Sequence, residues 1–134
     1  MSQFADVAAG IRNQIAAYTQ ALDDGRTDDV VATFCNDAAV DIPGLGRFEG
    51  REAIRAAYAG WTPTRPQRHL VLNTLVTRWD EQEAEATSDV VFLLLRKSGW
   101  SVELVGRYRD TLRLEGDMWR FARREAEFVA PDGP

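Results

Sequence analysis

The chain contains a single histidine, His69, which stands in the segment RPQRHLVLN. Imidazole is the side chain whose ordinary pKa lies closest to neutral pH, so His69 is the first candidate for moving a proton. Strand alternation would place His69 on the same face as Asn73, and both faces of this strand are half apolar. The segment therefore leaves two interpretations open: a general base, or an ordinary hydrogen-bonded histidine at the start of a strand.

Asp23 is the second candidate, because it stands beside Leu22 at the flank of an apolar helical stripe. Two acids at the end of this helix, Asp23 and Asp24, oppose the helix dipole, which favours a partner for one of them. A carboxylate bonded to His69 would fix the tautomer of the imidazole, raise its basicity and leave the other ring nitrogen free. A solvated helix end is the alternative interpretation of the same two acids.

Asp110 is an acid on an apolar face of the strand segment GRYRDTLRL. Burial would raise the pKa of its carboxyl group unless a positive partner lowers it. If the segment EGD forms a hairpin that pairs Glu115 with Met118, the register places Asp110 opposite Arg123. The pattern favours an inward Asp110–Arg123 ion pair over a catalytic Asp110.

Several aromatic residues have the spacing of core positions, and some of them are candidates to line a pocket for an apolar or aromatic ligand. The candidate ligand contacts are Tyr18, Tyr58, Trp61, Asn73, Asp110 and Phe121. With one cysteine, Cys35, and one histidine, the chain lacks the set of ligands that structural zinc needs, and no EF-hand or HExxH spacing is present. We expect neither a metal nor a cofactor, and a buried, inert Cys35 thiol.

Helical spacing predicts a helix over residues 4–24, a short second helix near residue 27, and a third over residues 51–61. The segments AAVDIPG and GRFEG indicate short extended stretches between them. From residue 67 the period becomes two, over residues 67–79, 84–97, 100–114 and 118–129, which predicts an antiparallel meander. The sequence therefore predicts one α+β domain over residues 1–134, in which three helices cover a curved sheet and enclose a cone-shaped pocket.

The chain has 134 residues and a formal net charge of −5, with arginines interspersed among acids. This argues against a nucleic-acid partner, which would require clustered basic residues. No stretch approaches the roughly 20 apolar residues of a membrane span, and the first residues lack the pattern of a signal peptide. We expect a cytoplasmic protein whose partner is a small molecule.

The segments AAYTQALDDGRTDDVVATFCNDAAVDIPGLGRFEGREAI and GRYRDTLRLEGDMWRFARRE, with a strand that begins at a histidine, resemble the SnoaL-like branch of the NTF2-like superfamily. The resemblance covers nearly the whole chain and implies a cone of helices on a curved sheet. By comparison with scytalone dehydratase, it assigns Asp23 and His69 to an acid–base dyad. It also implies a homodimer through the exposed sheet face, where VVFLLL carries much apolar surface.

The chain departs from the superfamily's enzymes at Ile42. Scytalone dehydratase has a tyrosine there, and ketosteroid isomerase has its general-base aspartate. A second histidine of scytalone dehydratase has no counterpart in a chain with one histidine. The resemblance therefore indicates a type of chemistry and not a substrate.

Our leading hypothesis is a cofactor-independent lyase or isomerase of the dehydratase or cyclase kind, acting on a small apolar or aromatic molecule. Polyketide-like compounds are among the candidates. His69 would be the general base, Asp23 would orient it, and Tyr18 or Asn73 would donate a hydrogen bond to a developing oxyanion. The competing hypothesis is a non-catalytic ligand-binding or dimerisation module in which Asp23 and His69 form a structural pair.

Overall fold

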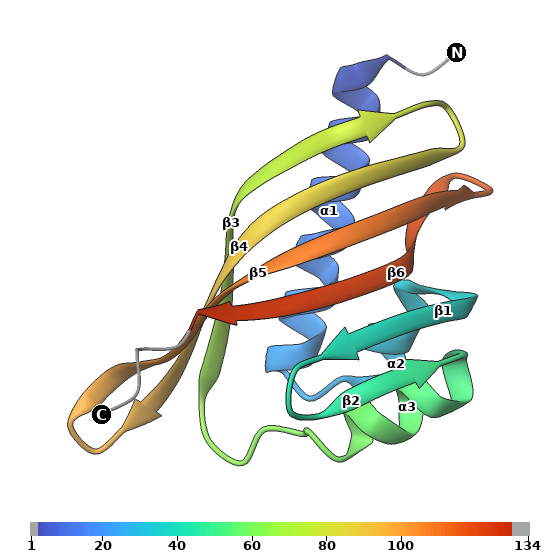
Figure 1. Cartoon of the computed structure of the whole chain (residues 1–134). Helices are drawn as coiled ribbons and strands as arrows, with labels where there is room; N and C mark the ends of the chain where they lie inside the picture. The colour runs from blue at the N-terminus through green and yellow to red at the C-terminus, as the bar shows by residue number, and fades with distance from the viewer. Residues whose placement is uncertain (1–2, 130–134) are drawn as a thin grey trace.

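The computed structural model describes residues 3–129 as helices packed on one strongly curved, open sheet (Figure 1). The elements follow the chain in this order: α1 (Phe4–Asp23), α2 (Thr27–Ala32), β1 (Phe34–Ile42), β2 (Gly46–Glu49), α3 (Arg51–Ala59), β3 (Gln67–Trp79), β4 (Glu83–Arg96), β5 (Gly99–Glu115) and β6 (Met118–Val129). This architecture confirms the predicted α+β cone.

The sheet has the strand order β2-β1-β6-β5-β4-β3. The four long strands form the predicted antiparallel meander, while β1 joins β6 in parallel and carries β2 at the sheet edge. The sequence predicted the extended stretches of β1 and β2 but not their place in the sheet. Because β1 returns beside the last strand, α3 packs against β1 and β2 at that end of the sheet (Figure 1).

Helix α1 lies across the sheet and packs against β3 and β6. Its apolar stripe, which recurs every three to four residues, is buried through Ile11, Ile15, Tyr18 and Leu22. Gly25 ends the helix region with a φ of 73°, a left-handed conformation that glycine adopts without a steric penalty. The last turn of α1 lies against the first residues of β3.

A bulge in β3 changes which side chains face the helices. In β3, Leu72 pairs with Asp89 but Leu75 pairs with Thr87, so this strand holds one extra residue, and Asn73 has a φ of 55°. Beyond the bulge, Thr74 points inward, where its hydroxyl lies 2.9 Å from that of Ser88. The strict alternation that placed Asn73 on the His69 face is therefore wrong.

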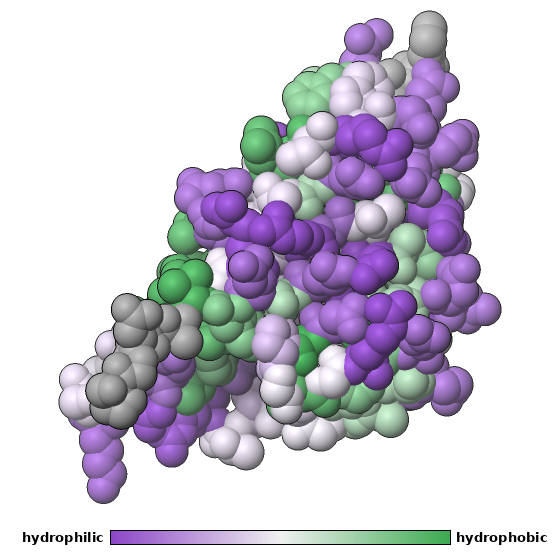
Figure 2. Space-filling view, viewed as in Figure 1, coloured by the Kyte–Doolittle hydropathy of each residue, from purple (hydrophilic) through white to green (hydrophobic). Residues whose placement is uncertain are grey.

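The sheet face turned away from α1 is largely polar, and hydrophobic residues follow the border along which β3 runs (Figure 2). Leu70, Leu72 and Leu75 are 42%, 46% and 61% exposed there, and Val102 and Val105 of β5 are also exposed. A second copy of the chain covering this face stays a prediction. No helix among residues 3–129 is long and apolar enough to span a membrane.

Candidate active site

A cavity of about 270 Å³ lies between α1, α3 and the concave side of the sheet. Most of its wall is apolar and includes Leu22, Ile42, Val90, Phe92, Leu104 and Phe128. Its polar lining residues are Tyr18, Tyr58, Gln67, His69, Tyr108 and Arg124. An apolar pocket with a few converging polar groups is the usual form of a small-molecule site.

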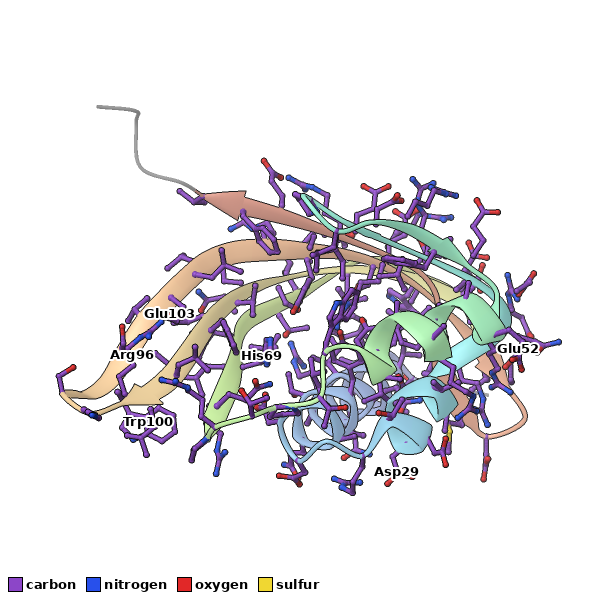
Figure 3. All side chains as sticks on the ribbon, turned by 90° about the horizontal axis from the view of Figure 1, so that it is seen from below. Asp29, Glu52, His69, Arg96, Trp100 and Glu103 are labelled. Atoms are coloured by element: carbon purple, nitrogen blue, oxygen red, sulfur yellow. The ribbon has the colours of Figure 1, made fainter. Side chains whose placement is uncertain are left out.

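Asp23 and His69 are in direct contact, although 46 residues separate them in the sequence. The Nδ1 atom of His69 lies 2.6 Å from Oδ1 of Asp23, and the side chains are 16% and 6% exposed. Asp23 is the last residue of α1, and His69 is the third residue of β3. Figure 3 shows His69 on the side of β3 that is turned toward the helices.

Asp23 is held by further donors. Its Oδ2 accepts a hydrogen bond from the backbone N–H of His69 at 2.8 Å, and its Oδ1 accepts one from Nε2 of Gln67 at 3.1 Å. With a carboxylate as acceptor, Nδ1 of His69 carries the hydrogen and Nε2 is left as the basic nitrogen. The imidazole also stacks on Phe92, with ring centroids 4.5 Å apart, so its orientation is fixed from two sides.

Two tyrosines form a second polar group in the cavity. The hydroxyls of Tyr18 and Tyr58 lie 2.5 Å apart, and both rings are buried. Burial raises the pKa of each phenol, so both stay protonated at neutral pH. The pair can therefore donate a hydrogen bond but does not serve as a base.

Arg124 and Asp110 form a buried ion pair on the neighbouring strands β6 and β5. Oδ1 of Asp110 accepts from Nε of Arg124 at 2.8 Å, and Oδ2 accepts from Nη2 at 3.0 Å. Burial acts to lower the pKa of Arg124, but the charge and hydrogen bonds of Asp110, together with Tyr18 and Tyr108, more than offset this, so the pKa is raised and the guanidinium stays charged. Arg124 lines the cavity and Asp110 lies behind it.

The predicted partner of Asp110, Arg123, is wrong by one residue. The hairpin does pair Glu115 with Met118, but a bulge between Thr111 and Leu112 in the pairing adds a residue to β6. Asp110 consequently faces Arg124. The side chain of Arg123 is half exposed and contacts acidic residues on the surface.

The other predicted ligand contacts divide into two groups. Tyr18, Tyr58 and Trp61 line the cavity. Phe121 is fully buried and packs behind it, with its ring centroid 5.7 Å from that of Tyr18. Asn73 lies outside, where Nδ2 donates to Asp89 at 2.8 Å, so it is not placed to bind an oxyanion in the cavity.

The sequence interpretation missed Gln67, Tyr108 and Arg124 as cavity residues. Gln67 was findable, because it precedes His69 by two positions and so shares its face of the strand. Tyr108 shares the Asp110 face by the same rule. Arg124 could not be found, because its inward direction depends on a bulge that no residue pattern marks.

Cys35 lies apart from the cavity and is fully buried. Burial raises the pKa of its thiol to about 11, so it stays protonated and unreactive at neutral pH. Over residues 3–129, no three His, Cys, Asp or Glu side chains are grouped closely enough to hold a metal ion. Of the polar residues that line the cavity, His69 carries the side chain whose ordinary pKa lies nearest to neutral pH.

The fold and cavity define an NTF2-like cone with a candidate acid–base site, and comparison with known families gives the narrower assignment. The model of the SnoaL-like domain matches residues 4–125. The chain therefore belongs to the SnoaL-like domain family. No curated protein sequence matches it.

Solved structures with a similar fold include three from Novosphingobium aromaticivorans. One is a candidate scytalone dehydratase, with 25% identity and a TM-score of 0.82 over 92% of this chain and 84% of that chain. One is an NTF2-like protein with a cystatin-like fold, with 22% identity and a TM-score of 0.81 over 98% and 94%. The third is the β subunit of a candidate aromatic-ring-hydroxylating dioxygenase, with 22% identity and a TM-score of 0.81 over 97% and 94%.

Proposed function

We propose that this protein is a cofactor-independent acid–base lyase or isomerase that acts on a small apolar or aromatic molecule. The observation that carries the proposal is the 2.6 Å contact between Asp23 and His69 at the wall of an apolar cavity. A carboxylate-oriented imidazole beside an apolar pocket is suited to removing a proton from carbon. The likeness to a candidate scytalone dehydratase, at 25% identity, supports the lyase class.

The reaction begins when Nε2 of His69 takes a proton from a carbon next to a carbonyl group. The C–H electron pair forms a C=C bond while the π pair of the carbonyl moves onto its oxygen, which gives an enolate, and Asp23 stabilises the imidazolium. The Tyr18–Tyr58 pair donates a hydrogen bond to the enolate oxygen. An isomerase then returns the proton to another carbon. A lyase instead expels a β-hydroxyl group, which leaves with the imidazolium proton as water.

Ile42 narrows the chemistry further. It lines the cavity at the position where ketosteroid isomerase has its base, and an alkyl side chain cannot take a proton. In this chain the base therefore comes from β3. This strand forms one edge of the sheet, and β1 lies near the other edge. The substrate carbon that loses the proton must point toward β3.

Deuterium exchange into a model ketone tests this function without knowledge of the natural substrate. With 2-tetralone in D₂O, the wild-type protein should accelerate exchange at the carbons next to the carbonyl, followed by NMR. His69→Ala should lower the protein-dependent rate by about 10²- to 10⁴-fold, the usual contribution of a positioned base. Asp23→Asn should lower it less, because the base remains but its tautomer is no longer fixed.

Arg68→Ala is the matched control, since Arg68 precedes His69 on the same strand but is exposed and does not line the cavity. It should exchange at the wild-type rate. A folded His69→Ala variant that exchanges 2-tetralone as fast as wild type would refute the proposed base.

A second candidate function is a non-catalytic ligand-binding module. It is favoured by the hydrogen bond from the His69 backbone to Asp23, which ties the end of α1 to the start of β3 and would do so without any proton transfer. In that case the protein binds 2-tetralone in the cavity, but neither the wild type nor any variant accelerates exchange.

A further inference from the structure

Leu45 lies in the turn that joins β1 to β2 and has an unusual combination of properties. It lines the apolar cavity, but it is 54% exposed, which makes it the most exposed of the described residues in the cavity wall. The other lining residues are buried or partly buried. The cavity therefore reaches the surface beside Leu45.

The pairing of β1 with β6 places this turn at one end of the cavity. The two strands are parallel, and Asp41 pairs with Glu125 just before the turn begins. Figure 1 shows both strands ending on the same side of the molecule. Phe128, near the end of β6, also lines the cavity. Leu45 and Phe128 therefore belong to the same end of the cavity wall.

Phe128 is the fixed part of this end. It pairs with Gly106 of β5, and a Cβ on that glycine would lie 2.9 Å from the Phe128 ring and 2.5 Å from the backbone oxygen of Glu127. The ring thus rests directly on the β5 backbone, a close approach that glycine permits. The position of Phe128 is therefore set by the pairing of β5 with β6.

The turn that carries Leu45 has room to move. Gly44 and Gly46 flank it, with φ values of 79° and 120° that glycine adopts without a steric penalty. A Cβ on Gly44 would meet nothing within 4 Å, and one on Gly46 would meet only the Phe48 ring, at 3.7 Å. One backbone bond within the turn, from the Leu45 N–H to the Ile42 oxygen at 3.0 Å, keeps it compact. The space around both glycines is open, so a change of their backbone angles would meet little obstruction.

The base of the turn, in contrast, is held in place. Nη1 of Arg47 on β2 donates to Oδ2 of Asp41 on β1 at 2.8 Å. The same oxygen of Asp41 lies 3.7 Å from Nη2 of Arg123 on β6. Movement of the turn is therefore confined to the residues between the two strands, which include Leu45.

We propose that the β1–β2 turn closes over the occupied cavity, so that Leu45 covers the outer end of the ligand. Leu45 is then a specificity-determining residue that selects small molecules whose outer end is apolar. The driving force is the removal of the Leu45 side chain and the adjacent ligand surface from water. The inference rests on the proposed function only because it takes the cavity as the ligand site, and closure itself requires no proton transfer.

Thiol labelling measures the closure directly. Cys35 is fully buried and burial raises the pKa of its thiol to about 11, so Leu45→Cys introduces the one thiol that reacts readily with iodoacetamide. Saturating 2-tetralone should slow this labelling by about tenfold or more, because the covered thiol is removed from solvent. Leu70→Cys is the matched control, since Leu70 is 42% exposed but does not line the cavity. It should be labelled at the same rate with and without 2-tetralone. An unchanged labelling rate in Leu45→Cys would overturn the inference.

Binding affinity for 2-tetralone, measured by calorimetry, tests the role of Leu45 in specificity. Leu45→Ala should weaken binding by about fivefold, because less apolar surface is buried over the ligand. Leu45→Asp should weaken it further, since a charge cannot be buried against an apolar molecule without a large cost. Leu45→Met, which keeps a long apolar side chain, should bind within about twofold of wild type. Wild-type affinity in a folded Leu45→Asp variant, or no binding of 2-tetralone by wild type, would overturn the inference.

His69→Ala combined with Leu45→Cys separates this inference from the proposed function. The combined variant should no longer exchange 2-tetralone, but 2-tetralone should still slow its labelling. This result supports both proposals. Exchange that persists while labelling is slowed would refute the proposed base and leave the role of Leu45 standing. Exchange by the wild type, with labelling that 2-tetralone does not slow, would refute the closure and leave the base standing.

Discussion

The molecule holds two buried carboxylates with nitrogen partners, and they differ in what their surroundings allow. Asp110 is sealed on all sides and faces a guanidinium group that stays charged. Asp23 faces an imidazole, which can gain and lose a proton and lines an apolar cavity. One pair therefore supplies a fixed charge, and the other can transfer a proton.

The comparison shows that the partner decides the role of a buried acid more than burial does. Burial raises the pKa of Asp110, an effect that the Arg124 charge opposes. Breaking this pair would leave an isolated charge in the interior, which is costly. Asp23 accepts hydrogen bonds from two residues of β3 and faces an imidazole, so replacing it with a neutral amide leaves no fixed charge unpaired.

Replacing each of the two aspartates by asparagine should give the largest difference in the free energy of unfolding. Asp110→Asn leaves Arg124 charged and unpaired in the interior, so the free energy of unfolding should fall by about 3–5 kcal/mol. Urea denaturation followed by circular dichroism measures it. A loss below about 1 kcal/mol would mean that Arg124 finds another partner, and the contrast between the two pairs would disappear.

Alkaline pH should act on the Arg124 side of the cavity, where the three tyrosines of the chain lie. Burial raises their pKa values above the ordinary value near 10. Stability from their protonated state is fully present below pH ~10, and it should fall by up to about 1.4 kcal/mol per tyrosine for each pH unit above that.

Tyrosinate absorbance and circular dichroism, recorded together from pH 9 to 12, check this expectation. The tyrosines should ionise only as the protein unfolds, so the two signals should change over the same pH range. A tyrosine that ionises near pH 10 in the folded protein would contradict the burial of the cluster.

The sequence predicted the Asp23 side of the comparison better than the Asp110 side. Asp23 ends α1 and His69 lies near the start of β3, so the residue patterns marked both as candidates, and the family resemblance then assigned them to a dyad. The partner of Asp110 depends on the pairing register along a hairpin. A single bulge places Arg124 opposite Asp110 instead of Arg123. The predicted inward position of Asn73 is wrong for the same reason, because β3 also contains a bulge.

Bulges escape prediction because the extra residue has no required type. At Asn73 the positive φ is compatible with asparagine but does not demand it. At Ala122, the added residue of β6, nothing in the side chain marks an irregularity. A missed bulge leaves the predicted fold correct. It reverses, however, the predicted direction of a site residue's side chain, from the cavity to the outer face of the sheet.

Asp23→Asn is the smaller member of the carboxylate comparison. The amide oxygen can still accept one hydrogen bond, and no buried charge is left without a partner, so the loss should be about 1 kcal/mol. Urea denaturation under the conditions used for Asp110→Asn gives the direct contrast. Losses of equal size in the two variants would show that burial alone sets the cost.

Gln67→Leu should have the smallest effect on stability, and it tests which residue positions His69. Its Nε2 donates to the same oxygen, Oδ1, that contacts His69, so its removal leaves that oxygen to the imidazole alone. Stability should fall by about 0.5 kcal/mol, the lower end of the net value of one hydrogen bond. The rate of 2-tetralone exchange should then change at most a few-fold, because the His69 contact with Asp23 persists. If Gln67→Leu abolished exchange as fully as His69→Ala, the glutamine and not the aspartate would be the residue that positions the base.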